Sequence, residues 1–407
     1  MEELARESIS LLARSASHAD SPRLGSFGAV FIMLKSALGA GLLNFPWAFQ
    51  KAGGVTTAVS VELVSLVFLI SGLVILGYAS SVSRQKTYQD VVREVCGGAV
   101  GQLCEVCFCF NLFMICVAFL VVVQDQLEKC KLSRYLQWTT WSMAVVYRLL
   151  PLFPPRLVKK KYSKAVHSVL GTLAATYLCA AVIVKYYLME SHDAIITPDS
   201  WGSMFSVVPT ICFGFQCHEA CIAIYSSMEN QKLFHWAVIS VVSMFFCLLI
   251  YTLTGVYGFL TFGRTVASDI LMSYPGDDVV IIISRLLFGI SIITIYPIIL
   301  LLGRRRLGIV THSFESRCRV VLTVIWITIT LLIAMFVPDM GDVISVIGGI
   351  SAFFIFIFLV TGLSLDVPDF LHCRVILTVW GVITIVVGAF IFGQSTTIAV
   401  MELCHKF

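Results

Sequence analysis

KSALGAGLLNFP occupies Lys35–Pro46, within the first long apolar stretch of a chain of 407 residues. Gly39 and Gly41 weaken a helix at mid-span, and Pro46 lacks the backbone N–H that a helix interior needs. A break at membrane depth exposes amide and carbonyl groups, which is tolerated only where protein or a water-filled cavity surrounds it. The stretch therefore predicts a break at a binding site or, alternatively, glycines that let two helices pack closely.

Composition places the chain in a membrane. Hydrophobic residues make up 58% of it and charged residues 13%, whereas a soluble domain carries about 25% charged residues. The mean hydropathy is +0.92. The first 26 residues are polar and lack the apolar core of a signal peptide, so we expect the first apolar stretch to remain as a membrane helix.

Eleven segments are long and apolar enough to cross a bilayer, which needs about 20 residues. They are 27–50, 54–80, 98–124, 138–155, 163–188, 203–227, 235–262, 279–302, 319–337, 342–364 and 374–399. The expected fold class is an all-α membrane protein with one transmembrane domain over 27–400. Residues 1–26 and 401–407 would be short tails.

The basic residues of the loops indicate the orientation. Eighteen Lys and Arg residues lie on the face of the N-terminal tail and six on the opposite face. Since cytosolic loops carry the excess of Lys and Arg, we expect a cytosolic N-terminus and, with eleven spans, an extracellular C-terminus.

A second interruption stands in the sixth span, where Pro209–Glu219 reads PTICFGFQCHE. Gly39 and Gly214 are separated by 175 positions, so spans one to five and six to ten form two halves of opposite topology, with the eleventh span outside this 5+5 inverted repeat. Interrupted helices at matching places in inverted halves indicate a binding site between them. Helix N-termini favour a carboxylate and freed carbonyls an ammonium group or sodium, which is the charge pair of an amino acid.

Several motifs resemble known transporters. Ser36–Phe49 with Ala52–Gly54 resembles the first helix of the amino acid/auxin permease family. Pro209–Glu219 and Ser345–Ile350 (SVIGGI) resemble the sodium-coupled neutral amino acid transporters, solute carrier family 38, and Leu271–Gly276 (LMSYPG) resembles one member in particular. The resemblance implies eleven helices in the fold of the bacterial leucine transporter. It also implies sodium symport of small neutral amino acids such as glutamine and alanine, with cationic amino acids or proton coupling as alternatives.

The resemblance implies a substrate site at the two interruptions, formed by Ser36, Gly39, Ala40, Gly41, Cys212, Phe213, Gly214 and Phe215. The amides around Gly39–Gly41 would hold the substrate carboxylate, and the carbonyls near Cys212–Gly214 its ammonium group. Phe215 would close over the ligand or, alternatively, serve only in helix packing.

The same resemblance implies a sodium ion between the first and eighth helices. The backbone carbonyls of Lys35 and Leu38 and the hydroxyls of Ser291 and Thr294 would bind it, and the two hydroxyls share one helical face because they are three residues apart. Hydroxyls in membrane helices also serve as ordinary interhelical hydrogen-bonding groups, which is the alternative here.

Lys35 departs from the family pattern, in which relatives commonly carry asparagine at that place. Its ammonium group could extend to the cytosolic interface. It could instead pair with Glu62 or Glu219, or occupy the cation pocket in place of sodium.

Glu62, His218 and Glu219 are candidates for proton binding or pH sensing, because ionisable groups within membrane spans are functional candidates by default. His218 has a simpler alternative as a neutral, hydrogen-bonded packing residue. The fourteen cysteines are mostly within apolar runs, and Cys104, Cys107 and Cys109 have only Glu105 as a further ligand nearby, so we expect no metal beyond sodium.

We expect no cofactor, no enzymatic activity, no nucleic acid and no obligatory protein partner; the partners would be the amino acid and the lipid bilayer. Glu7–Leu12 (ESISLL) fits an acidic dileucine sorting pattern, which makes an endolysosomal location the alternative to the plasma membrane. An amino acid sensor built on a transporter fold is the alternative function.

Overall fold

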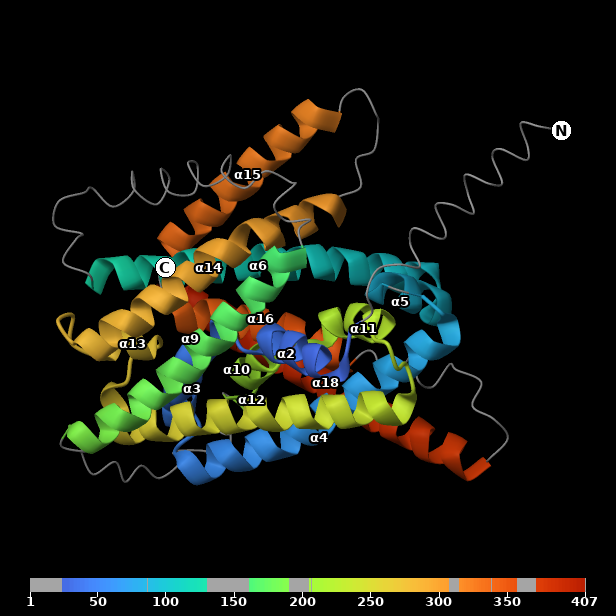
Figure 1. Cartoon of the computed structure of the whole chain (residues 1–407), viewed down its shortest axis with the longest axis horizontal. Helices are drawn as coiled ribbons and strands as arrows, with labels where there is room; N and C mark the ends of the chain where they lie inside the picture. The colour runs from blue at the N-terminus through green and yellow to red at the C-terminus, as the bar shows by residue number, and fades with distance from the viewer. Residues whose placement is uncertain are drawn as a thin grey trace.

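A computed structural model describes residues 24–85, 87–129, 161–189, 205, 207–306, 315–337, 339–356 and 371–406. Helices dominate these residues, as Figure 1 shows. They are α2 Ser26–Ala37, α3 Gly41–Lys51, α4 Val55–Ser83, α5 Tyr88–Cys96, α6 Gly98–Lys129, α9 Lys161–Leu188, α10 Val208–Gly214, α11 His218–Ser227, α12 Leu233–Phe262, α13 Ile270–Ser273, α14 Val279–Arg306, α15 Glu315–Phe336, α16 Met340–Phe356 and α18 Leu371–Lys406, with a short 3₁₀ helix over Gly263–Thr265.

Helices overlap the predicted spans wherever the structure describes them; the span 138–155 lies outside the described residues. Within the described part, five helices are long and apolar enough to cross a membrane, and the bent pair α2–α3 makes a sixth. The total of eleven spans and the inverted repeat stay predictions. The helix α18 continues without a break from Leu371 to Lys406, and the predicted tail from 401 stays a prediction.

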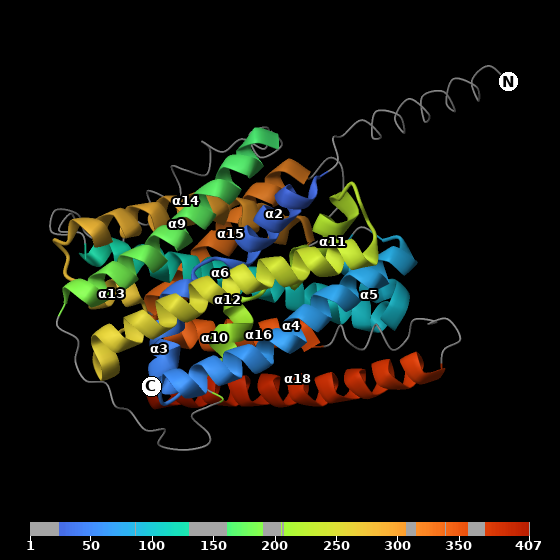
Figure 2. The same cartoon turned by 60° about the horizontal axis from the view of Figure 1, so that its bottom comes forward.

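The structure confirms both interruptions. The axes of α2 and α3 differ by 57°, and between them Leu38 is extended, with ψ at 103°. The helix α10 ends at Gly214, and α11 begins only at His218. The interrupted helices lie at the centre of the bundle, where α10 packs against α3 and α16, and α12 packs along α2 and α3 (Figure 2).

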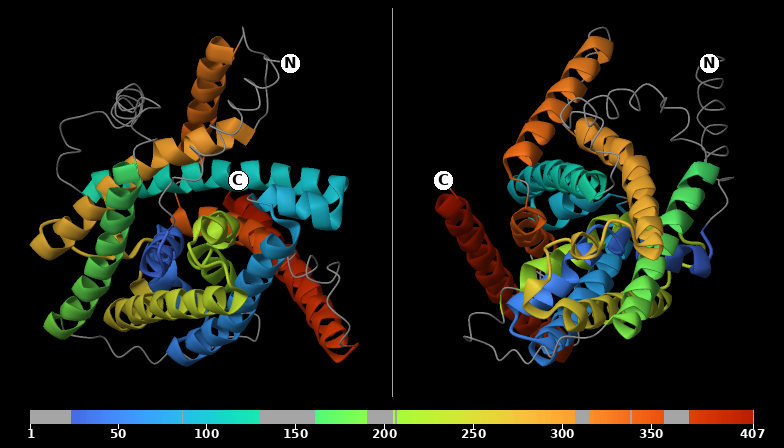
Figure 3. Two further views of the ribbon diagram at one scale, coloured as in Figure 1. Left: turned by 45° about the vertical axis from the view of Figure 1, so that its right-hand side comes forward. Right: turned by 90° about the vertical axis from the view of Figure 1, so that its left-hand side faces the viewer.

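The outer helices present apolar side chains away from the bundle. Val64 of α4, Phe246 of α12, Phe336 of α15 and Val386 of α18 are among the exposed large hydrophobic residues. Figure 3 shows α15 and α18 at the periphery of the bundle. Such a surface suits contact with lipid, because hydrocarbon is as apolar as these side chains.

The two interruptions touch each other through glycine. A Cβ on Gly41 would lie 2.9 Å from the Gly214 Cα and 3.2 Å from the Phe213 Cδ1. Gly41 therefore serves both roles that its sequence allowed, as part of a helix break and as a point of close packing.

A third glycine brings α16 against α10. A Cβ on Gly348 would lie 2.2 Å from the Pro209 carbonyl oxygen, which is far inside van der Waals contact. Pro209 is in the first turn of α10, where proline is compatible with a helix because the N–H it lacks would be unsatisfied anyway. Gly348 thus fixes how closely the SVIGGI segment approaches the interrupted sixth span.

Gly348→Ala should lower the free energy of unfolding by about 1–3 kcal/mol, since the added methyl group must push α16 away from α10. Thermal unfolding of the purified protein in detergent measures this. The matched control is Gly393→Ala in α18, where an added Cβ meets nothing within 4 Å. A thermal midpoint for Gly348→Ala equal to that of the control would contradict the packing described here.

Candidate substrate and ion site

The break ends meet at one tyrosine. The Ala37 carbonyl ends α2, the Gly214 carbonyl ends α10, and the Tyr251 hydroxyl lies 2.8 Å and 2.9 Å from their respective oxygens. Tyr251 is fully buried in α12, and its ring stacks on Phe45 with centroids 4.2 Å apart. Sequence reasoning missed Tyr251, because one aromatic residue in an apolar span gives no signal.

The predicted carboxylate side lies at the start of α3. Gly39 is exposed, whereas Ala40 and Gly41 are buried. The Leu42 and Leu43 amides donate back to the Gly39 and Ala40 carbonyls in a tight first turn. The amides that precede them form the N-terminal end of α3, where a helix favours an anion.

The remaining predicted substrate residues are placed less uniformly. Ser36 is exposed, and its hydroxyl donates to the Ile32 carbonyl of its own helix at 2.9 Å. Cys212 is buried in α10. Phe215 is fully buried, with its ring centroid 4.9 Å from that of Tyr251 and 6.2 Å from that of Phe45, so in this structure it packs beneath the break.

Lys35 lies where the cation pocket was predicted. Its Nζ lies 3.3 Å from the Ser291 Oγ of α14, as a hydrogen-bond donor. Gly171 of α9 makes room for it, since a Cβ there would lie 1.9 Å from that nitrogen. Of the three alternatives for Lys35, this geometry matches the one in which its ammonium group lies between the first and eighth helices. The Thr294 side chain lies outside the described residues.

The two carboxylates predicted as partners of Lys35 accept hydrogen bonds from neutral donors. Glu62 of α4 accepts from the Thr252 hydroxyl at 2.8 Å. Glu219 accepts from the Asn111 amide at 2.6 Å and from the Gln216 amide at 2.7 Å. Neither carboxylate forms an ion pair with Lys35, which donates to Ser291 instead.

The Glu219 contacts extend into a network across three helices. Gln216, between α10 and α11, also accepts a hydrogen bond from the Ser351 hydroxyl of α16 at 2.6 Å. Asn111 brings in α6. His218 Nε2 lies 3.1 Å from the Leu69 carbonyl, and the ring is buried, which fits the packing role left open for this histidine.

An asparagine links the break to the connection between α12 and α14. The Asn44 amide of α3 donates to the Ser268 carbonyl at 2.8 Å, and its oxygen accepts from the Thr210 hydroxyl of α10 at 2.9 Å. Asn44 therefore ties the second half of the first span, α3, to the first half of the sixth span, α10, and to the connection beside them. Its place in the first motif gave no indication of this role.

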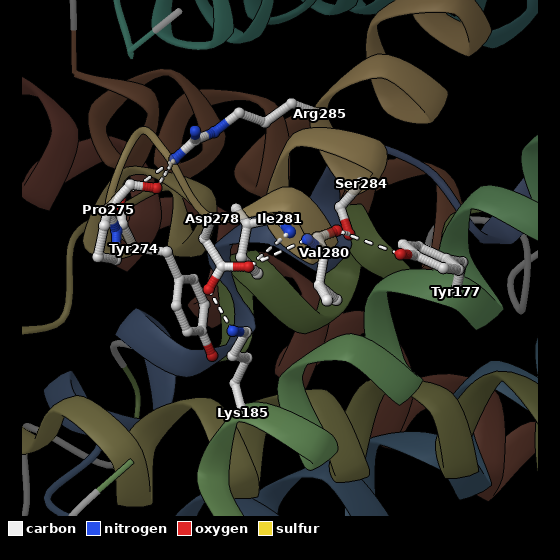
Figure 4. Close-up of polar contacts among 9 residues, drawn as sticks. All are labelled: Tyr177, Lys185, Tyr274, Pro275, Asp278, Val280, Ile281, Ser284 and Arg285. Atoms are coloured by element: carbon white, nitrogen blue, oxygen red, sulfur yellow. Dashed lines mark hydrogen bonds and ion pairs between the residues drawn. The ribbon is translucent and has the colours of Figure 1, made fainter. Parts of the chain in front are cut away.

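The same connection is held by charged residues. The Arg285 guanidinium is buried and donates to the carbonyls of Leu271, Tyr274 and Pro275 at 2.9–3.3 Å, and Lys185 of α9 forms an ion pair with Asp278 (Figure 4). These contacts fix the connection to α14 at one end and to α9 at the other.

Asp269 is the buried carboxyl of this connection. Its oxygens accept from the Gln126 amide of α6 at 2.6 Å and from the Leu271 N–H at 2.8 Å. Burial raises the pKa of Asp269 to about 7, against the opposing effects of the Leu271 N–H, Arg285 and Gln126. Among the residues that the structure describes, no group of three or more His, Cys, Asp or Glu could hold a metal ion.

Comparison with known proteins identifies the family. The family model described as transmembrane amino acid transporter protein matches residues 23–401. "Putative sodium-coupled neutral amino acid transporter 8" of Xenopus tropicalis is 58% identical over 100% of both chains. "Solute carrier family 38 member 8" of Homo sapiens is 52% identical over 93% of this chain and 94% of the relative. The chain belongs to solute carrier family 38.

Solved structures show the fold of this family 38 protein. A manganese transporter mutant of Eremococcus coleocola matches with a TM-score of 0.55 at 10% identity, over 92% of this chain and 94% of that one. MhsT in complex with L-phenylalanine matches with a TM-score of 0.52 at 13% identity, over 94% and 99%. The family 38 protein therefore has the helical fold of the bacterial leucine transporter, as a multi-pass membrane protein of an amino acid transporter family.

Asp269→Asn should make the stability of this family 38 protein less dependent on pH. Below pH 3.8 the carboxyl is protonated whether the chain is folded or unfolded. Between pH 3.8 and about 7 this carboxyl is ionised in the unfolded chain but still protonated in the folded one. Over this range the free energy of unfolding of the wild type therefore falls by on the order of 4 kcal/mol relative to that of the variant. Thermal unfolding at pH 5 and pH 8 measures the difference, and an equal pH dependence in both proteins would contradict it.

Proposed function

We propose that this protein transports small neutral amino acids, glutamine and alanine among them, across the membrane by alternating access and with sodium coupling. The observation that carries the proposal is the convergence of the Ala37 and Gly214 carbonyls on one point beside the N-terminal end of α3. Carbonyls attract an ammonium group and a helix N-terminus attracts a carboxylate, so the site matches a zwitterion. The names of the relatives support the sodium coupling and the neutral substrates.

In this proposal the amides of Gly39, Ala40 and Gly41 hold the substrate carboxylate. The carbonyls from Cys212 to Gly214 hold the ammonium group together with that of Ala37, which the prediction from sequence did not include. Phe215 changes position to cover the ligand. Ser36 contributes at the edge of the site, where it is exposed.

The proposed sodium site consists of the Lys35 and Leu38 carbonyls and the Ser291 and Thr294 hydroxyls. The Lys35 ammonium group lies 3.3 Å from Ser291. Two unit charges 4 Å apart repel by about 4 kcal/mol at an effective dielectric of 20, so sodium binds here only if Lys35 moves away. The specific contact favours a second candidate, in which the Lys35 ammonium group takes the place of sodium and transport needs no sodium.

We further propose a 5+5 inverted repeat with a cytosolic N-terminus, an extracellular C-terminus and a location in the plasma membrane. The distribution of Lys and Arg supports the orientation. Residues 7–12, which carry the dileucine pattern, lie outside the described residues. An endolysosomal location is the alternative.

Uptake by the purified protein in proteoliposomes tests the function. A panel of radiolabelled amino acids is offered with external sodium or with choline in its place. Accumulation of glutamine and alanine that needs sodium supports the proposal, and equal accumulation in choline supports the second candidate. Binding without accumulation would refute transport and favour the sensor.

Gly41→Val should abolish uptake, because the added side chain collides with the Gly214 Cα, 2.9 Å from the first added carbon, and crowds the carboxylate site. Gly393→Val is the control, since its position is exposed and open. Uptake is compared at equal amounts of folded protein in the liposomes. Normal uptake by Gly41→Val would refute the assignment of this break.

Lys35→Asn should change the cation dependence of uptake, because it removes the ammonium group beside Ser291 and leaves a neutral amide. We expect the sodium concentration for half-maximal uptake to fall by about tenfold or more, in keeping with the repulsion of a few kcal/mol that is removed. A sodium titration with each protein measures it. An unchanged titration would show that Lys35 does not affect the sodium site.

A further inference from the structure

Among the described residues, the Tyr251 hydroxyl is the one group recorded in contact with the carbonyls of both break ends. It is 2.8 Å from the Ala37 oxygen and 2.9 Å from the Gly214 oxygen. A phenol has one hydrogen to donate, so it serves these two acceptors in turn or unequally. An ammonium group has three hydrogens and a full charge, and hydrogen bonds from charged donors are the stronger ones.

The ring of Tyr251 is fully buried and closely packed, which holds its hydroxyl at the two carbonyls. The ring lies between Phe45 and Phe215, with centroid separations of 4.2 Å and 4.9 Å. A Cβ on Gly214 would already lie 2.8 Å from the Phe45 Cε2 and 3.3 Å from the Tyr251 Cζ. A substrate ammonium group that bonds to both carbonyls must lie at the point between them that the hydroxyl occupies, so it has to displace the hydroxyl.

We propose that the Tyr251 hydroxyl competes with the ammonium group of the amino acid for the Ala37 and Gly214 carbonyls. The hydroxyl holds these carbonyls between transport cycles, and the substrate displaces it on binding. This inference rests on the proposed function and adds to it a residue that sets substrate affinity. The competition lowers the affinity for amino acids, because the hydroxyl must break its hydrogen bonds to the two carbonyls before the ammonium group can bind them.

Tyr251→Phe tests the competition because it removes one oxygen and keeps the aromatic ring. The KM of the proteoliposomes for L-alanine should fall about fivefold to tenfold, the effect of one hydrogen bond to a buried acceptor. The maximal rate should fall as well, because the substrate leaves the carbonyls more slowly. Tyr225→Phe is the matched control, since that hydroxyl donates to the Gln231 carbonyl at the far end of α11, and its KM should be unchanged.

Thermal unfolding with and without L-alanine distinguishes the competition from a purely structural role of Tyr251. Without amino acid, Tyr251→Phe should unfold at a lower temperature than the wild type, since it leaves buried carbonyls without a donor. Saturating L-alanine should remove most of that difference. If Tyr251 were only structural, the difference would be the same with and without L-alanine.

The outcomes separate this inference from the proposed function. If the wild type neither accumulates L-alanine nor is stabilised by it, the proposed function fails. If the wild type does both, and Tyr251→Phe has an unchanged or higher KM, only the competition is overturned. Tyr251→Met is a second variant without a hydroxyl; if neither variant yields folded protein, the hydroxyl is a fixed structural contact and the inference is overturned.

Discussion

Backbone amide and carbonyl groups in a membrane must find partners within the protein, and this requirement governs the centre of the molecule. A continuous helix satisfies this requirement with its own hydrogen bonds. At the breaks after Ala37 and Gly214 these bonds are missing, so the freed backbone groups need partners from other elements. The partner of the two carbonyls comes from far away in the sequence, since Tyr251 of α12 donates to both. Asn44 adds side-chain contacts with Thr210 and Ser268 that join the same elements.

Close packing accompanies this arrangement, because one hydroxyl can reach both break ends only where their backbones lie close together. Gly41 meets Gly214, and Gly348 meets Pro209, at distances that leave no room for a Cβ. These contacts set α3, α10 and α16 against one another at the level of the breaks. The Gln216–Glu219–Asn111 contacts then connect that level to α6 with side chains instead of backbone.

The sequence predicted the breaks because glycine and proline act on the backbone locally, and a pair of them in two spans is visible without a structure. Lys35 stands out because it departs from the family pattern, in which relatives commonly carry asparagine. The sequence could not predict the partners of either. Tyr251 meets Ala37 from 214 positions away, and nothing in the residues around Tyr251 distinguishes it from a packing aromatic. The helix α18 continues past the predicted span to Lys406, which polarity alone does not indicate, because a helix needs no membrane to continue.

Lys35 and Tyr251 have one physical property in common that bears on how a transporter works. Each places a donor of the chain itself where the proposed ligands would bind, a cation beside Ser291 and a hydroxyl at the Ala37 and Gly214 carbonyls. The measured affinity of such a site is the difference between holding the ligand and holding the internal donor. A carrier has to release its substrate on the far side as readily as it binds it on the near side. Internal donors serve that need, because they satisfy the buried acceptors as the ligand leaves and so spare the protein the cost of unpaired carbonyls.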